Sequence, residues 1–296
     1  MKLGLGTAQF GMHYGISNAQ GACSKEEVAK ILFAAASHHV SFLDTAPAYN
    51  NSEFILGELC RPDWQFNIVT KIPNLQNTLQ QDKAIRNSLH SSLANLRIKT
   101  VYGLLVHNAD DLIDPVYGQQ TWETMLELKA QGLVKKIGAS VYTAEQIERL
   151  MNVYAIDLIQ LPINVFDQRL LQKGHLVALK KMGVEIHARS IFLQGLMLMQ
   201  LNDIPDFFNP IKANILSYHQ WLSANNMTQL QAALHFIAGI KEIDIALVGV
   251  NNLQHLQEIL SYNSAANDLN DFSQFAVDID KMIDPSQWQL SSALIV

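Results

Sequence analysis

The stretch VSFLDTAPAYNNSE, residues 40–53, has the pattern of a buried β-strand that ends in polar groups. Its first four residues are mostly apolar and suit the interior of a sheet. A carboxylate, Asp44, follows them directly, and a phenol, Tyr49, stands five residues later. Whether these two groups take part in chemistry depends on the fold that surrounds the strand.

Short apolar segments rich in Val, Ile and Leu recur along the whole chain. Together with residues 41–46 they lie at 3–7, 66–72, 101–107, 135–141, 157–163, 184–191 and 243–250. Amphipathic stretches separate them, with helix-capping residues at Ser24, at Thr143 and at Asn251 or Asn252. Near-continuous apolar strands that alternate with helices predict a parallel sheet covered on both faces. Eight such units predict an α/β fold, a (β/α)8 TIM barrel that forms one domain over residues 1–296.

A doubly wound sheet is the main alternative. Such a fold normally carries G-x-G-x-x-G after its first strand, whereas residues 4–9 here read GLGTAQ and lack the third glycine. The barrel is therefore favoured. Residues 194–213 predict a long irregular loop, which we place over the mouth of the barrel.

The composition limits the classes of function. The chain has 296 residues, of which 49% are hydrophobic and 16% charged, and its formal net charge is −6. Nucleic acid and anionic membranes require a basic face, so we expect neither as a partner. The sequence shows no transmembrane run, no secretory signal pattern and only two cysteines, which together predict a cytoplasmic protein. A monomer and a homodimer both remain open.

Polar side chains end three consecutive predicted strands. Asp44 and Tyr49 follow the second strand, Lys71 ends the third and His107 ends the fourth. In a (β/α)8 barrel the chemistry lies at these carboxyl ends. We expect Lys71, balanced by Asp44, to lower the pKa of Tyr49, which is otherwise a poor acid at neutral pH. His107 can donate a hydrogen bond to a carbonyl oxygen, and a hydride from a nicotinamide would provide the missing attack on carbon. We expect no metal.

The chain resembles the aldo-keto reductase family over essentially its whole length. The resemblance rests on LDTAPAYNNSE (43–53), IVTK (68–71) and LLVHN (104–108), followed in order by KKIGASVY (135–142), DLIQLPINVFDQR (157–169), ARSIFLQGLM (188–197) and ALVGVNNLQHLQEIL (246–260). The opening segment LGTAQFGMHYGI (5–16) is similar to a bacterial subgroup often found among surface-polysaccharide and nucleotide-sugar genes.

This resemblance implies reduction of a small aldehyde, ketone or sugar carbonyl with NADPH or NADH. Tyr49 would be the general acid, with Lys71 and Asp44 as its tuning pair. His107 would orient the carbonyl group. The implied cofactor-binding residues are Gly6, Thr7, Ser140, Gln160, Arg189, Ser190, Gly249, Asn251, Asn252 and His255, of which Ser140 and Gln160 would hold the nicotinamide carboxamide. His13 and Tyr14, in the loop after the first strand, are expected to contact substrate.

Three departures from the family pattern bear on the cofactor. Val141 replaces the usual Asn beside Ser140, which removes one hydrogen bond to the carboxamide. Arg189 replaces an aromatic residue, and we hypothesise that its charge favours the reduced cofactor or contacts an anionic substrate. Residues 248–255 contain no Lys or Arg to pair with the 2′-phosphate of NADP, although helix N-terminal amides can hold a phosphate.

The missing basic residues leave three cofactor hypotheses. NADP binds weakly, NAD is used instead, or the cofactor site has degenerated. The last case would make the chain a non-redox binding or regulatory protein, or a sugar-modifying enzyme on the same barrel. Because the set of Asp44, Tyr49, Lys71 and His107 is complete, the reductase is the favoured interpretation.

Overall fold

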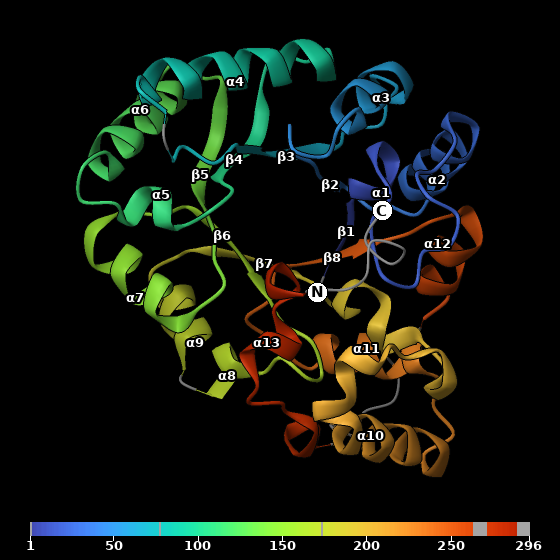
Figure 1. Cartoon of the computed structure of the whole chain (residues 1–296). Helices are drawn as coiled ribbons and strands as arrows, with labels where there is room; N and C mark the ends of the chain where they lie inside the picture. The colour runs from blue at the N-terminus through green and yellow to red at the C-terminus, as the bar shows by residue number, and fades with distance from the viewer. Residues whose placement is uncertain (1, 77, 173, 263–270, 289–296) are drawn as a thin grey trace.

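Eight short strands pair side by side, all of them parallel, and the last pairs with the first (Figure 1). The computed structural model describes residues 2–76, 78–172, 174–262 and 271–288. The strands are β1 (Lys2–Gly6), β2 (Phe42–Asp44), β3 (Asn67–Ile72), β4 (Val101–Val106), β5 (Val134–Ser140), β6 (Leu158–Pro162), β7 (Glu185–Arg189) and β8 (Ile245–Gly249). Pairing of β1 with β8, from Lys2 opposite Ile245 to Gly6 opposite Gly249, closes the barrel. The predicted (β/α)8 barrel is thereby confirmed, and each predicted strand segment overlaps one strand, with β1 and β5 beginning one residue earlier than predicted.

Helices ring the barrel on its outside (Figure 1). The longer ones are α2 (Lys25–Ser37), α3 (Ser52–Leu59), α4 (Gln81–Leu96), α6 (Gly118–Ala130), α7 (Ala144–Val153), α9 (His175–Lys181), α10 (Lys212–Ala224), α11 (Gln229–Ala238) and α12 (Leu253–Leu260). Short helices are α1 (Ala8–Gly11), α5 (Asp110–Ile113), α8 (Arg169–Gln172) and α13 (Asp280–Ile283). The predicted caps are present: the Ser24 side chain accepts from the Glu27 amide, and Thr143 forms a capping box with Gln146.

Apolar side chains fill both sides of the strands. The outer faces join the helices in one large core, and smaller groups of side chains fill the barrel interior, such as Val69, Leu105 and Leu158. Gly103 on β4 has no room for a side chain, because a Cβ there would lie 2.8 Å from a methyl group of Leu158. Burial on both faces explains why the strands appear in the sequence as near-continuous apolar runs.

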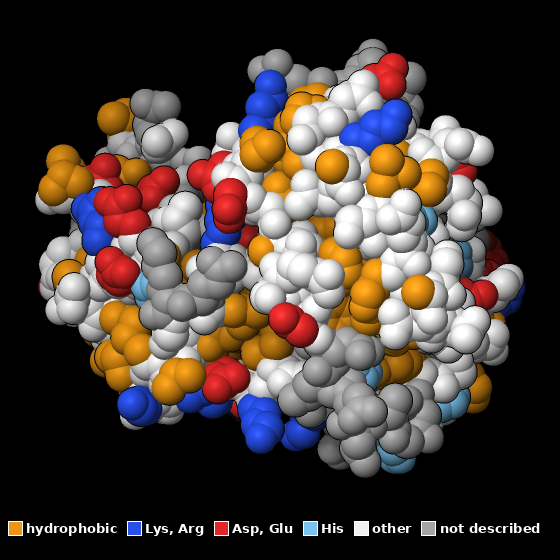
Figure 2. Space-filling model, turned by 90° about the horizontal axis from the view of Figure 1, so that it is seen from below, with side chains coloured by type: hydrophobic (Ala, Val, Ile, Leu, Met, Phe, Trp, Pro, Cys, Tyr) orange, Lys and Arg blue, Asp and Glu red, His pale blue; other side chains and the backbone are white. Residues whose placement is uncertain are grey.

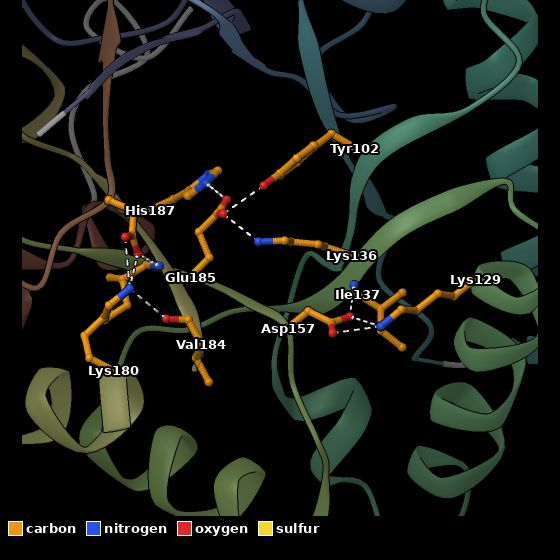
Figure 3. A network of polar contacts seen from close by, with 11 residues as sticks. Tyr102, Lys129, Lys136, Ile137, Asp157, Lys180, Val184, Glu185 and His187 are labelled. Carbon is orange, nitrogen blue, oxygen red and sulfur yellow. Dashed lines mark hydrogen bonds and ion pairs between the residues drawn. The ribbon is translucent and has the colours of Figure 1, made fainter. Parts of the chain in front are cut away.

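A polar network closes the amino-terminal end of the barrel, which we call the barrel floor (Figure 3). Lys136 and the Tyr102 hydroxyl lie 2.6 Å and 2.8 Å from one carboxylate oxygen of Glu185. The other oxygen lies 2.8 Å from Nε2 of His187, which is fully buried. These groups lie at the end of the barrel opposite to the strand ends that carry Asp44 and Lys71. They stabilise the fold rather than contribute to a cleft.

Two lysine–aspartate pairs tie the helices to this floor (Figure 3). Lys129, in the last turn of α6, binds both oxygens of Asp157 at 2.6 and 2.7 Å, and Asp157 accepts the amide of Ile137 in β5. Lys180, in the last turn of α9, binds Asp244 in the same way at 2.7 and 2.9 Å, and Asp244 accepts an amide of β7. Each pair joins a helix end to the start of a strand.

The predicted irregular loop at 194–213 contains three short 3-10 helices, Leu193–Leu198, Leu201–Asp203 and Asp206–Ile211. The turn that leads into it from β7 has left-handed backbone at Ser190, Leu193 and Gln194, with φ between 46° and 58°. Such conformations are uncommon for residues other than glycine and mark a tightly specified turn.

The face shown in Figure 2 carries acidic and basic side chains scattered among apolar ones. No continuous basic patch covers the coloured part of this face, as expected for a chain with net charge −6. Within the described ranges, no helix is both long enough and apolar enough to cross a membrane.

Candidate active site

A cleft of about 360 Å³ opens at the carboxyl ends of the strands, and we call it the strand-end cleft. Most of the predicted site residues line it: Gly6, Thr7, Tyr14, Asp44, Tyr49, His107, Ser140, Gln160, Arg189, Ser190, Gly249, Asn251 and His255. Residues far apart in the sequence therefore meet in one concave site, as the barrel rule predicts.

A buried ion pair lies beneath this cleft. The Lys71 ammonium is 2.8 Å from each carboxylate oxygen of Asp44 and 3.0 Å from the carbonyl oxygen of Thr45. Only 1% of Lys71 and 5% of Asp44 are exposed. Gln160 donates a further hydrogen bond of 2.7 Å to Asp44. All these polar groups are paired, as buried charges require.

Local packing fixes the loop that carries Tyr49. The amide and the hydroxyl of Thr7 both donate to the Asp44 carbonyl at 2.9 Å, and Ser52 donates to the Thr7 carbonyl at 2.8 Å. Gly11 is required where α1 meets this loop, because a Cβ there would lie 2.0 Å from the Tyr49 carbonyl oxygen. The first strand and its short helix thus hold Tyr49 over the cleft.

The surroundings of Tyr49 raise the pKa of its phenol above the ordinary value of 10.0. Burial is the main cause, the Asp44 carboxylate adds to it, and the Arg189 cation opposes both. The expectation that Lys71 lowers this pKa is therefore wrong. The Lys71 ammonium is already paired with Asp44 and lies 3.4 Å from the phenol oxygen, so its charge is largely balanced. Tyr49 keeps its proton throughout the neutral range.

His107 lies beside Tyr49 at the end of β4. The two rings meet edge to face, with their centroids 6.0 Å apart. Burial lowers the pKa of His107 to about 4, and the positive charges of Lys71 and Arg189 act in the same direction. The imidazole is therefore neutral at physiological pH and offers one N–H as a donor. A neutral donor next to a protonated phenol suits a site that binds and then protonates a carbonyl oxygen.

Ser140 and Gln160 provide a donor set that fits a carboxamide. Both line the cleft, Ser140 as the last residue of β5 and Gln160 opposite it in β6. Gln160 uses its amide nitrogen on Asp44, and its side-chain oxygen has no hydrogen-bond partner among the described residues. The same holds for the Ser140 hydroxyl. Val141 turns away into the core and is fully buried. These free polar atoms fit the amide end of a nicotinamide.

Arg189 forms a flat cationic wall of the cleft. Its guanidinium carbon lies 4.1 Å from the centre of the Tyr142 ring, and Nη2 donates to the Val141 carbonyl at 3.1 Å. It makes no ion pair with a carboxylate among the residues that the structure describes. The charge of Arg189 therefore remains available to whatever the cleft binds.

The turn after β8 differs from the expectation. Asn252 does not line the cleft; its side chain accepts from the His255 amide at 2.9 Å and caps α12. The Leu253 amide donates to the Glu27 carboxylate at 2.7 Å. The expectation that amides at this helix start can hold a phosphate is thus wrong for these two amides, because they are already bonded.

His13, which was expected to contact substrate, does not line the strand-end cleft. Its Nε2 lies 2.5 Å from the Asn18 carbonyl oxygen.

A sequence model of the Aldo/keto reductase family matches residues 2–276. The chain belongs to this family. It is 27% identical over 188 residues to the aldo-keto reductase YhdN of Bacillus subtilis, covering 57% of this chain and 52% of that protein. It is 26% identical over 180 residues to the NADH-specific methylglyoxal reductase of Escherichia coli, covering 53% and 54% of the two chains. The matches thus span about half the length of these curated relatives.

Solved structures of aldo-keto reductases share the fold. The holo form of an aldo-keto reductase from Bacillus halodurans superimposes with a TM-score of 0.74 at 15% identity, covering 99% of this chain and 95% of the other. At this identity the likeness shows the barrel alone.

Sequence reasoning missed several residues of this aldo/keto reductase cleft. Gln9 packs against Gly249, where a Cβ would lie 2.4 Å from the Gln9 amide nitrogen. Tyr142 and Gln194 also line the cleft, from the loops after β5 and β7. All three lie within segments quoted for the resemblance, but the sequence analysis assigned none of them a role. Pro285 and Ser286 reach the cleft from the C-terminal segment, which carries no motif.

Proposed function

We propose that this aldo/keto reductase reduces the carbonyl group of a small aldehyde, ketone or sugar to an alcohol, with a reduced nicotinamide nucleotide as the cofactor. The observation that carries the proposal is the arrangement of Tyr49 and His107 at the cleft surface over the buried Lys71–Asp44 pair. A protonated phenol, a neutral donor and a paired ammonium at three neighbouring strand ends together suit carbonyl reduction.

The reaction divides between the cofactor and the chain. When bound, the reduced nicotinamide supplies the hydride that adds to the carbonyl carbon. His107 donates its N–H to the carbonyl oxygen and holds the group in place. Tyr49 gives its proton to that oxygen as negative charge develops there, so the product leaves as an alcohol. The positive charge of Arg189 favours the phenolate that remains.

The cleft provides the groups that would hold the cofactor. Ser140 and Gln160 would bind the carboxamide, and Arg189 would lie against the nicotinamide. Gly6, Thr7 and Gly249 line the stretch between this end and the start of α12. Ser190, Asn251 and His255 are proposed as further contacts, and Tyr14, which is 36% exposed at the cleft, as a substrate contact.

The similar protein from Escherichia coli is named an NADH-specific methylglyoxal reductase. That name supports a small carbonyl compound as the substrate class and makes NADH a candidate cofactor beside NADPH. The mouth of the cleft, with Tyr14, Tyr142 and Arg189, also suits a polar sugar carbonyl, because it offers hydroxyl groups and an unpaired cation.

Two measurements test this function. Fluorescence titration of the purified protein with NADH and with NADPH should show saturable binding of at least one of them. The protein should then reduce members of a panel of aldehydes, ketones and keto sugars, followed by loss of nicotinamide absorbance, and Tyr49→Phe should abolish this turnover. A folded protein that binds neither nucleotide would overturn the proposal and favour a non-redox role.

A further inference from the structure

Arg189 brings an unpaired positive charge into the strand-end cleft. Among the described residues that line this cleft, Arg189 is the one Lys or Arg and Asp44 is the one carboxylate. The Asp44 charge is balanced by the Lys71 ammonium at 2.8 Å, whereas no Asp or Glu in the described part of the chain forms an ion pair with Arg189. The cleft therefore keeps an uncompensated positive charge, in a chain whose net charge is −6.

The Arg189 guanidinium is held in place without being neutralised. Its central carbon lies 4.1 Å from the centre of the Tyr142 ring, Nη1 donates to the Ser190 hydroxyl at 3.3 Å, and Nη2 donates to the Val141 carbonyl oxygen at 3.1 Å. A guanidinium carries five N–H groups, and the others have no partner among the described residues. A fixed planar fork with free N–H groups suits an anion that presents two oxygens in one plane, namely a carboxylate.

The charge of Arg189 also acts on the two groups proposed for the chemistry. Burial raises the pKa of Tyr49, the Asp44 carboxylate adds to this rise, and Arg189 opposes both. At His107 burial lowers the pKa, and the Lys71 and Arg189 charges lower it further. Because such interactions weaken with distance, Arg189 lies close to the place where Tyr49 and His107 would bind a carbonyl group. An anion bound to Arg189 would therefore lie beside the reacting carbon.

Tyr14 adds a neutral donor beside this cation. It lies in the loop after β1 and lines the same cleft. Burial of its hydroxyl and the nearby Tyr49 raise the pKa of Tyr14 to about 12, while Arg189 opposes them. The hydroxyl therefore keeps its proton at neutral pH and can donate to an anion. A cation and a protonated hydroxyl thus face the same part of the cleft.

We propose that Arg189 is a specificity-determining residue that binds a carboxylate group of the substrate, so that oxo acids are preferred over uncharged carbonyl compounds. A carboxylate carries one charge, as Arg189 does. A phosphate monoester carries close to two, and the described lining of the cleft offers no second Lys or Arg. Stacking uses the faces of the guanidinium and hydrogen bonding uses its edge, so a contact with the nicotinamide leaves N–H groups for the substrate.

This inference rests on the proposed carbonyl reduction and leaves its chemistry unchanged. The hydride adds to the carbonyl carbon and the proton of Tyr49 to its oxygen, so an oxo acid leaves as a hydroxy acid. The carboxylate itself takes no part in bond making or breaking. It supplies binding and orientation, in which a charge-assisted hydrogen bond contributes more than a neutral one.

The test compares acids with their esters. The three isomers of carboxybenzaldehyde hold the carboxylate at three fixed distances from the aldehyde, and each methyl ester keeps the aldehyde and removes the charge. With whichever reduced nucleotide binds, kcat/KM of the wild-type protein for at least one acid should exceed that for its ester by about tenfold or more.

Arg189→Gln should bring this ratio of acid to ester close to one, and Arg189→Lys should restore part of it. The ratio cancels any effect of the variant on nucleotide binding or on the chemical step, because both substrates share them. The matched control is Arg149→Gln on α7, since Arg149 is exposed and forms no ion pair among the described residues. This variant should leave the ratio unchanged.

Three results would overturn the inference, and they separate it from the reductase proposal. Equal kcat/KM for every acid and its ester would overturn it while the reductase proposal stands. Weaker nucleotide binding by Arg189→Gln, with an unchanged ratio of acid to ester, would overturn it by assigning the charge to a phosphate of the nucleotide. Turnover of neither acids nor esters would overturn the reductase proposal and this inference with it.

Discussion

The Lys71 ammonium lies 2.8 Å from both carboxylate oxygens of Asp44 and 3.4 Å from the phenol oxygen of Tyr49. The lysine is therefore primarily the partner of the aspartate, and Tyr49, the proposed general acid, lies at the edge of a neutralised pair. The sequence alone does not distinguish a residue that holds the site together from one that delivers a proton. The geometry gives the first role to Lys71 and leaves the second, as a proposal, to Tyr49.

The ion pair leads to a prediction on stability. Lys71→Met leaves the Asp44 carboxylate buried without its partner and should lower the free energy of unfolding by about 3–5 kcal/mol. The double variant Asp44→Asn with Lys71→Met removes both charges and should recover most of the lost free energy of unfolding. Urea denaturation of the three proteins measures this. A double variant as unstable as Lys71→Met alone would show that packing, and not the unpaired charge, causes the effect.

Tyr49 leads to a prediction on rate. Tyr49→Phe removes the proton donor with little change in shape, and turnover should fall by about 10²–10⁴-fold. Nucleotide binding, measured by fluorescence, should be retained. Tyr14→Phe is the matched control, since it removes a hydroxyl from the same cleft. An equal loss of turnover in both variants would argue against Tyr49 as the acid.

The ionisation of the two cleft groups predicts a flat pH profile. The pKa of His107 is lowered to about 4, so the ring is neutral above that pH, and the pKa of Tyr49 is raised above 10.0, so the phenol stays protonated. Neither group changes charge near neutrality, and kcat/KM should vary by less than about threefold between roughly pH 6 and 9. A transition centred near pH 6.5 that disappears in His107→Gln would contradict the buried, neutral state of His107.

The fold was predictable from the sequence because its signal is local and repeated. A strand covered on both faces must be apolar along its length, and eight such runs separated by helices fit few architectures. The polar residues at strand ends were predictable for the same reason, since Asp44, Lys71 and His107 interrupt apolar runs. The pKa of Tyr49 was not, because it depends on the depth of burial and on how the Lys71 charge is shared.

The contacts of Glu27 and Gln9 could not be found in this way. Glu27 satisfies an ordinary helix-start pattern with Ser24, yet its side chain bonds to Leu253, 226 positions away. Gln9 packs on Gly249 across the closure of the barrel. No spacing rule in a single sequence links such positions, since only the closed barrel brings them together.

The barrel floor leads to a prediction on acid stability. Burial raises the pKa of Glu185, but hydrogen bonds from His187, Lys136 and Tyr102 outweigh it and lower the pKa to about 2. Because the folded value lies below the ordinary 4.5, the stabilisation is complete above that pH and is lost as the pH falls towards 2. Its size is about 3 kcal/mol.

Glu185→Gln should therefore destabilise the protein at pH 7 and make its stability less dependent on pH between about 5 and 3. Guanidinium denaturation at several pH values measures both effects. Glu145→Gln, at an exposed position of α7, is the control and should change neither. Unchanged acid sensitivity in Glu185→Gln would place the source of that sensitivity elsewhere.

Arg189 leads to a prediction on the redox form that binds. Its guanidinium, stacked on Tyr142 and without a carboxylate partner among the described residues, should disfavour the positive charge of an oxidised nicotinamide. The protein should bind NADH more tightly than NAD⁺, and Arg189→Gln should reduce that preference by about threefold or more. Calorimetric titration with both forms checks this, and a preference that the variant leaves unchanged would refute it.

The pairing of β1 with β8 places Gly6 opposite Gly249, and both line the strand-end cleft. The strand-end cleft therefore straddles the line along which the first and last strands meet. Because its two walls come from the first and the last strand, a nascent chain cannot complete the cleft until β8 has been synthesised and has docked. A ligand that contacts both Gly6 and Gly249 would bind the closed barrel alone and would stabilise it by holding its two terminal strands together.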